Sequence, residues 1–212
     1  MPRRPIVGGN WKCNPEKVEK LDELVANINA CDTSACDVYV CPSTLHIGMV
    51  YDKFTNGAKV TPQNCNFKGC GAYTGEMAAD QFAAMGIEWC LIGHSERRGE
   101  FGLPTPAESS ELLATKLAYL LEKGIKCVLA IGEPLPVREK GIDAVLAYCI
   151  EQLKPCLPHL DAEKVRQPPF ARSESPFLIS QSHPSSLGIT PIRPASALCL
   201  LTGADCSSLT RW

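Results

Sequence analysis

The stretch Trp89-Cys90-Leu91-Ile92-Gly93-His94-Ser95-Glu96-Arg97-Arg98 joins a short apolar run to a glycine and a cluster of polar and charged residues. An apolar run without alternation is typical of a strand that is buried on both faces of a parallel sheet. In α/β folds, functional side chains gather where such strands end and loops begin. The polar residues after Ile92 are therefore candidates for a functional site.

Further apolar runs of the same kind lie at 6–11, 38–41, 59–63 and 126–131, and helical patterns separate them. This alternation predicts an α/β fold with right-handed crossovers between the strands. A (β/α)₈ barrel uses ~31 residues for each unit, so residues 1–164 would hold about five units of one. An open, doubly wound sheet of five strands fits the same spacing, and the pattern alone leaves both architectures open.

Three helices are predicted between and after these strands. The expected boundaries are an N-cap at Asn14 followed by Pro15, a capping box over 105–108 with an end at Gly124, and a last helix over 143–154. The apolar stripes that should face the sheet are Val18, Leu21, Val25 and Ile28 in the first helix, and Leu113, Leu117, Leu120 and Leu121 in the second.

Charge and apolar content exclude several function classes. The chain has 212 residues, a net charge of −2 and 45% apolar residues. No apolar run approaches the length of a membrane span, and a near-neutral charge gives no field that attracts nucleic acid or an anionic membrane. The first residues lack the apolar stretch of a signal peptide, so we expect a cytoplasmic protein that binds neither nucleic acid nor membranes.

The chain contains 12 cysteines, but their spacing is not that of a metal site. None forms a C-x₂-C pair and no H-x₃₋₅-H follows, so we expect no metal ion. Cys90 and Cys127 lie within apolar runs, where a free thiol behaves as a small hydrophobic side chain. We therefore predict that most of the cysteines are buried and reduced.

The composition changes near residue 165. Residues 1–164 carry a net charge of −4, whereas residues 165–212 carry +2 and contain six prolines, nine serines and no lysine. Prolines at this density leave little room for a helix, and only 195–203 could form a short apolar element. We therefore predict a folded part over 1–164 and a disordered Pro/Ser-rich tail over 165–212.

The ends of two predicted strands carry side chains that could bind an anion and donate to a carbonyl oxygen. Asn10 and Lys12 follow the first apolar run, where an amide and an ammonium group can bind an anion and orient a carbonyl oxygen. His94 begins an expected helix, whose dipole would lower the pKa of the imidazole and keep it neutral. A neutral imidazole can donate to a substrate carbonyl, and Glu96 can pair with a cation. Taken singly, Lys12 also fits a solvated loop lysine and His94 a capping histidine.

Taken together, these stretches resemble the triosephosphate isomerase family. The matching segments are Gly9-Asn10-Trp11-Lys12, Gln63-Asn64, Gly71-Ala72-Tyr73-Thr74-Gly75-Glu76, Gly93-His94-Ser95-Glu96-Arg97-Arg98 and Ile131-Gly132-Glu133, with Arg138-Glu139 downstream. The resemblance covers about residues 5–164 and implies an incomplete (β/α)₈ barrel. It implies interconversion of dihydroxyacetone phosphate and D-glyceraldehyde 3-phosphate through an enediolate, a step of glycolysis and gluconeogenesis that needs no cofactor.

The resemblance also implies roles for single residues. Lys12 would supply positive charge to the phosphate and the reacting oxygen, Asn10 would orient the substrate, and His94 would polarise the carbonyl group. Glu96 would position Lys12 through an ion pair, and Cys127 would lie beside the site. The family is homodimeric, and the segment 65–79 resembles the arm that inserts into the partner subunit; the interface residues implied are Cys13, Thr74, Gly75 and Glu76.

One part of the family pattern is not found in these 212 residues. The family's base is a glutamate in an Ala-Tyr-Glu-Pro-Val-Trp stretch after the sixth strand, whereas the chain here reads Val165-Arg166-Gln167-Pro168-Pro169-Phe170. Glu174 lacks the flanking residues of that stretch. We therefore expect a truncated barrel with little or no isomerase activity, produced by a frameshift, a retained intron or alternative splicing. The alternative is a non-catalytic isoform that associates with an intact subunit.

Overall fold

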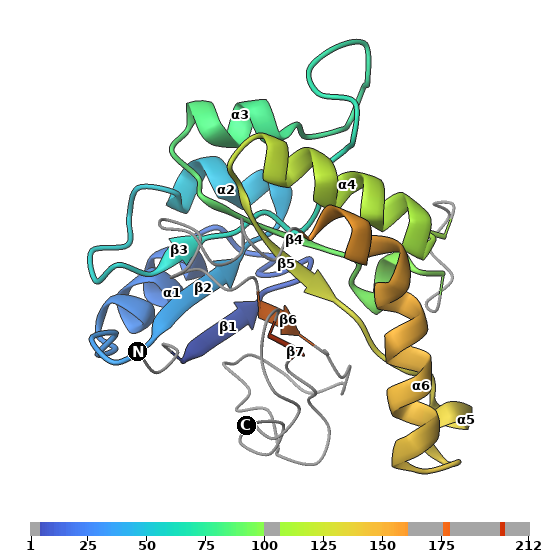
Figure 1. The fold of residues 1–212 in the computed structure, drawn as a ribbon. Coiled ribbons are helices and arrows are strands. Elements are labelled where there is room, and N and C mark those ends of the chain that lie inside the picture. The colour runs from blue at the N-terminus through green and yellow to red at the C-terminus, as the bar shows by residue number, and fades with distance from the viewer. Residues whose placement is uncertain (1–4, 100–106, 161–175, 179–199, 202–212) are drawn as a thin grey trace.

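The computed structural model describes residues 5–99, 107–160, 176–178 and 200–201, in which strands and helices alternate (Figure 1). The strands are β1 Ile6–Asn10, β2 Asp37–Cys41, β3 Lys59–Val60, β4 Trp89–Ile92, β5 Lys126–Ala130, β6 Pro176–Leu178 and β7 Leu200–Leu201. The helices are α1 Glu19–Asn29, α2 Thr44–Val50, α3 Ala79–Ala84, α4 Ser110–Glu122, α5 Leu135–Arg138 and α6 Ile142–Leu153, with 3₁₀ turns η1 Ser95–Arg97 and η2 Lys154–His159.

The first five strands are parallel and stand side by side in sequence order. β1, β2 and β3 form one ladder, and β4 and β5 form the start of another. The two ladders meet where the Leu91 N–H donates to the carbonyl oxygen of Pro62 at 2.8 Å. Sequential order is that of a (β/α)₈ barrel, whereas a doubly wound sheet reverses its strand order. The described chain is therefore part of a barrel, as the resemblance implied.

β4 and β5 and the second half of β2 are buried on both faces, as their continuous apolar runs predicted, whereas β1 is half-buried. On the helix side, α1 and α4 cover the sheet with Leu21, Val25, Leu113, Leu117 and Leu120, all of them buried. The opposite face carries a second apolar cluster of Tyr39, Cys41, Trp89, Leu91, Val128 and Ala130. The ring of Tyr39 stacks on that of Trp89 with centroids 6.0 Å apart and lies against Gly8, where a Cβ atom would be 2.1 Å from it. This close approach explains the glycine in β1.

Two predicted helix starts are wrong. The first helix begins at Glu19 rather than after Asn14, because residues 11–18 form a loop that turns at Lys12, and Val18 is consequently exposed. The second begins at Ser110, since the Ser109 hydroxyl accepts the N–H of Leu112 and caps it. The start of the predicted capping box, 105–106, lies outside the described residues. The predicted ends of both later helices agree within two residues.

The segment 165–212 contributes two short strands to the described residues. β6 pairs parallel with β5, and β7 pairs antiparallel with β6. β7 falls within the apolar stretch 195–203, whereas the sequence pattern did not predict β6. Without β6, this edge of β5 would present unpaired backbone N–H and C=O groups, and an extended segment can form hydrogen bonds with them. The remainder of the predicted tail lies outside the described residues.

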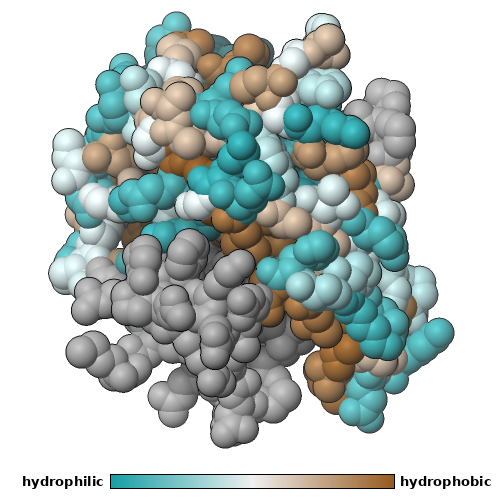
Figure 2. Space-filling model, turned by 45° about the horizontal axis from the view of Figure 1, so that its top comes forward, coloured by the Kyte–Doolittle hydropathy of each residue, from teal (hydrophilic) through white to brown (hydrophobic). Residues whose placement is uncertain are grey.

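Six of the ten described cysteines are buried and none is bonded to another: Cys41, Cys65, Cys90, Cys127, Cys149 and Cys156. Within the described ranges, no three side chains of His, Cys, Asp or Glu gather as a metal site would require, and no helix is long and apolar enough to cross a membrane. α6 exposes Ile142, Tyr148 and Ile150, and Figure 2 shows apolar surface on the side where Figure 1 places this helix.

Candidate functional site

The predicted site residues come together at the carboxyl ends of β1 and β4. Asn10 ends β1 and Lys12 follows two residues later, whereas His94 and Glu96 follow β4. The ammonium group of Lys12 lies 2.8 Å from Oε1 of Glu96, so the predicted ion pair between these two residues is present in the structure. Oε2 of the same carboxylate lies 3.4 Å from Nδ1 of His94. Glu96 therefore contacts both groups that were predicted to act on a substrate.

Lys12 has an uncommon backbone conformation. Its φ of 54° lies in the left-handed region, which costs a residue other than glycine about 1–2 kcal/mol. Two side-chain amides hold it there. The Lys12 N–H donates to Oδ1 of Asn10 at 2.9 Å, and Nε2 of Gln63 donates to the Lys12 carbonyl at 2.8 Å. Such strain persists where the surroundings over-determine the conformation, which is common at functional sites.

His94 is buried, with its side chain 6% exposed. Nδ1 accepts the N–H of Glu96 at 3.3 Å, so the neutral ring carries its proton on Nε2. Burial lowers the pKa of His94; the carboxylate of Glu96 raises it and the ammonium of Lys12 lowers it again. The sequence predicted this direction but attributed it to a helix dipole. η1 spans only three residues, and burial is the larger cause.

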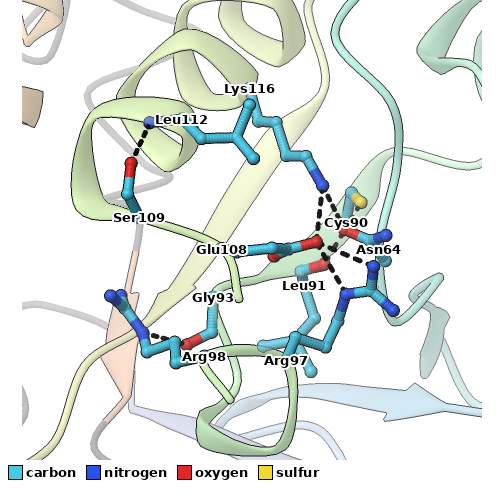
Figure 3. Close-up of polar contacts among 10 residues, drawn as sticks. All are labelled: Asn64, Cys90, Leu91, Gly93, Arg97, Arg98, Glu108, Ser109, Leu112 and Lys116. Carbon is cyan, nitrogen blue, oxygen red and sulfur yellow. Dashed lines mark hydrogen bonds and ion pairs between the residues drawn. The ribbon is translucent and has the colours of Figure 1, made fainter. Parts of the chain in front are cut away.

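Arg98 fastens this turn to the sheet and to α4. Its Nε donates to the carbonyl of Gly93 at 2.7 Å, its Nη2 to the carbonyl of Ala130 at 3.1 Å, and its Nη1 to the Ser110 hydroxyl at 3.3 Å. The ends of β4 and β5 are thereby held against the turn that carries His94 and Glu96. Figure 3 shows the contact between Arg98 and Gly93.

Residues 5–171 match the sequence profile of the family described as triosephosphate isomerase. The chain belongs to the triosephosphate isomerase family. The match extends a few residues beyond the compositional boundary at 165 and includes every site residue described above.

Three curated members of the triosephosphate isomerase family are similar to this chain. The enzyme of Coprinopsis cinerea is 38% identical over 164 residues, which are 77% of this chain and 62% of the relative. The cytosolic enzyme of Oryza sativa subsp. japonica is 36% identical over 69% of this chain and 58% of its own. The chloroplastic enzyme of Secale cereale is 39% identical over 70% and 48%. The chain thus spans about half to three fifths of the length of these relatives.

The lowered pKa of buried His94 predicts that the stability of the chain depends on pH. In the unfolded chain the His94 imidazole binds a proton at a higher pH than it does when buried in the folded chain. Protonation therefore favours the unfolded state, and the stability of the folded chain decreases as the pH falls below 6.5. We expect the urea midpoint of the wild-type chain to fall more steeply between pH 7 and pH 5 than that of His94→Asn. Parallel pH profiles of the two proteins would contradict the buried, neutral histidine.

A buried charge cluster next to the family motif was missed by the sequence prediction (Figure 3). Oε1 of Glu108 accepts from Lys116 at 2.9 Å and from Nε of Arg97 at 2.8 Å, and Nη2 of Arg97 forms an ion pair with it at 2.8 Å. Lys116 also donates to Oδ1 of Asn64 at 2.9 Å. The sequence pattern predicts a capping box that contains Glu108, whereas the structure places this carboxylate between two cations. The available signal was Lys116, which lies in the apolar stripe of α4, where a lysine needs a carboxylate partner.

The segment 65–79, which was predicted to be an inter-subunit arm, leaves the body of the molecule as a long loop between β3 and α3 (Figure 1). Asn66 fixes its base by accepting from the N–H groups of Lys68 and Gly69 and by donating to the Gly69 carbonyl. The residues predicted for the interface, Thr74, Gly75 and Glu76, are exposed at its outer part, and Cys13 is exposed in the loop after β1. Their role in a dimer stays a prediction.

Proposed function

We propose that this site binds a triose phosphate and polarises its carbonyl group for isomerisation through an enediolate, without a cofactor. The observation that carries the proposal is the pair of contacts made by Glu96, with Lys12 at 2.8 Å and with buried His94 at 3.4 Å. The Lys12 side chain is 36% exposed, so its ammonium can reach an anionic ligand while it stays paired. Asn10, which holds the Lys12 backbone, completes the proposed substrate-binding set.

His94 is suited to act on the carbonyl oxygen. A neutral imidazole whose Nδ1 accepts a backbone N–H presents Nε2–H as a donor, and donation strengthens as negative charge develops on the oxygen. A charged imidazolium would be a stronger donor, but burial and Lys12 disfavour that form. Lys12 would add electrostatic stabilisation of the same oxygen and of the phosphate.

Isomerisation also needs a base that moves a proton between the two carbon atoms. The family's glutamate stretch is not found in these 212 residues, and general-base catalysis contributes about 10²–10⁴-fold to a rate. We therefore propose that the 212-residue chain by itself binds substrate but turns it over at least about 100-fold more slowly than a full-length isomerase.

A coupled isomerase assay on the purified chain tests both parts, with His94→Asn as the control for contaminating host enzyme. We expect equal, low rates for the two proteins. Calorimetry should show binding of dihydroxyacetone phosphate that Lys12→Met abolishes. Turnover that disappears in His94→Asn would contradict the missing base, and Glu174 would then be substituted. Equal binding by wild type and Lys12→Met would contradict the proposed site.

A second candidate function is association with an intact subunit of the same family. The exposed arm favours it, because Tyr73 keeps 43% of its surface exposed beside the predicted interface residue Thr74. Co-expression with a tagged full-length isomerase should recover the chain with the tag. We expect Thr74→Arg to reduce recovery, and Thr115→Arg, another exposed threonine, to leave it unchanged. Recovery unaffected by Thr74→Arg would contradict docking through the arm.

We also propose that the protein acts in the cytoplasm. The rice relative is named as a cytosolic enzyme, and the rye relative as a chloroplastic one. Imaging of the chain with a carboxyl-terminal fluorescent tag distinguishes the two locations, because organellar fluorescence would contradict the cytoplasmic assignment.

A further inference from the structure

Gln63 reaches the lysine of the site from two strands away. It lies three residues beyond β3, and β2 separates β3 from β1 in the sheet. Its Nε2 donates to the Lys12 carbonyl at 2.8 Å and to the Cys41 carbonyl at 3.0 Å. The Cys41 carbonyl also accepts the N–H of Trp11 at 2.9 Å. Gln63 therefore binds the end of β2 and the chain after β1 at one point.

We propose that Gln63 is a positioning residue, which holds the Lys12 peptide in its left-handed conformation and so keeps the Lys12 ammonium group on Glu96 and beside His94. This inference rests on the proposed function, because the arrangement of Lys12, Glu96 and His94 matters only if the site binds a substrate. The position of Lys12 can be tested without measuring turnover.

The chemistry of the contact favours an amide at position 63. A primary amide nitrogen carries two N–H donors, and here both point at backbone carbonyl oxygens. A carboxylate at the same place would present oxygen atoms to two carbonyl oxygens and would repel both. An alanine would leave the Lys12 carbonyl without this donor, while Asn10 would still accept the Lys12 N–H.

Loss of the Gln63 contact should move the ammonium group. A lysine prefers right-handed or extended backbone, and a return to either rotates the side chain away from its present direction. The carboxylate of Glu96 would then raise the pKa of His94 without the ammonium group of Lys12 to lower it. Among the described residues, the charged groups that act on His94 are Glu96, which raises its pKa, and Lys12, which lowers it. His94 is thus a reporter of where Lys12 lies.

The test is an NMR titration of the His94 ring nitrogens in the full 212-residue chain. Gln63→Glu should raise the pKa of His94 by about one pH unit, the scale of one nearby charge, and Gln63→Ala should raise it in the same direction. Gln152→Glu is the matched control. The Gln152 amide also bridges backbone groups, donating to the Gly132 carbonyl at 2.6 Å and accepting the Gly132 N–H at 3.1 Å, but it does not contact Lys12.

The outcomes separate this inference from the proposed function. A raised pKa of His94 in both Gln63 variants, with Gln152→Glu like the wild type, supports positioning. An unchanged pKa in a folded Gln63→Ala chain overturns it, even if the variant is less stable. If Gln63→Glu does not fold, Gln63→Ala decides alone. Binding of dihydroxyacetone phosphate is measured separately, so its failure counts against the proposed function and leaves the His94 result standing.

Discussion

Glu108→Ala is expected to lower the free energy of unfolding by about 3–5 kcal/mol. Glu108 is 6% exposed and Lys116 4% exposed, so removal of the carboxylate leaves a buried ammonium group whose one remaining partner among the described residues is the Asn64 oxygen. Arg97 loses its partner at the same time. The cost comes mainly from the uncompensated charge, because an ammonium group without a counter-charge is poorly solvated in the protein interior. Urea unfolding followed by circular dichroism measures it.

Two further variants show whether the buried charge causes the loss. Glu151→Ala removes the partner of Lys154 from a pair in which both side chains are more than half exposed, and it should cost at most about 1 kcal/mol. The double variant Glu108→Leu, Lys116→Met removes both charges and should recover much of the stability lost in Glu108→Ala. Equal losses in Glu108→Ala and Glu151→Ala would contradict the cluster's burial.

Gly93→Ala is expected to cost about 2–4 kcal/mol of folding stability and to disturb the site. Gly93 has a φ of 78°, and an added Cβ atom would lie 2.9 Å from the Ala130 carbonyl oxygen and 3.0 Å from Leu113. It would also lie 3.1 Å from Nη2 of Arg98, which fastens the turn to β5. The backbone of β5 cannot move aside without breaking its pairing with β4, so the turn that carries His94 must shift instead.

Gly57→Ala is the control for the cost of a left-handed backbone conformation in a residue other than glycine. Gly57 has a φ of 87° and open space where the Cβ would be placed, so only the left-handed conformation is penalised, by about 1–2 kcal/mol. The difference between the two variants, measured by urea unfolding, isolates the steric conflict at the end of β4. A Gly93→Ala chain as stable as Gly57→Ala would contradict it.

The strands and the site were predictable because their information is local. A buried parallel strand is a continuous apolar run, and a functional residue follows it directly, so β4 and His94 could be found within ten consecutive residues. Single residues, however, had alternative explanations. The family resemblance of several stretches in order favoured the functional interpretation. The ion pair predicted between Lys12 and Glu96 is present in the structure, and His94 also caps η1.

The first residues of the helices were less predictable, because several short polar residues near each start can serve as the N-cap. Asn14 and Thr105 both fit the pattern of an N-cap, but the structure begins α1 at Glu19 and caps α4 with Ser109. The contact that fixes the start of α4 is the one in which the Ser109 hydroxyl accepts the N–H of Leu112. Glu108, which the pattern placed in a capping box, is instead bound by Arg97 and Lys116.

The sequence by itself determined the class of the fold and the family, and it predicted Asn10, Lys12, His94 and Glu96 as site residues, because apolar runs and family motifs lie in short stretches of the chain. The tertiary structure alone decided how those residues are held. Gln63 reaches Lys12 across 51 positions and Lys116 reaches Asn64 across 52, while burial is the largest cause of the lowered pKa of His94. Such contacts have no local pattern, since they form only when the packed strands and α4 bring distant side chains together.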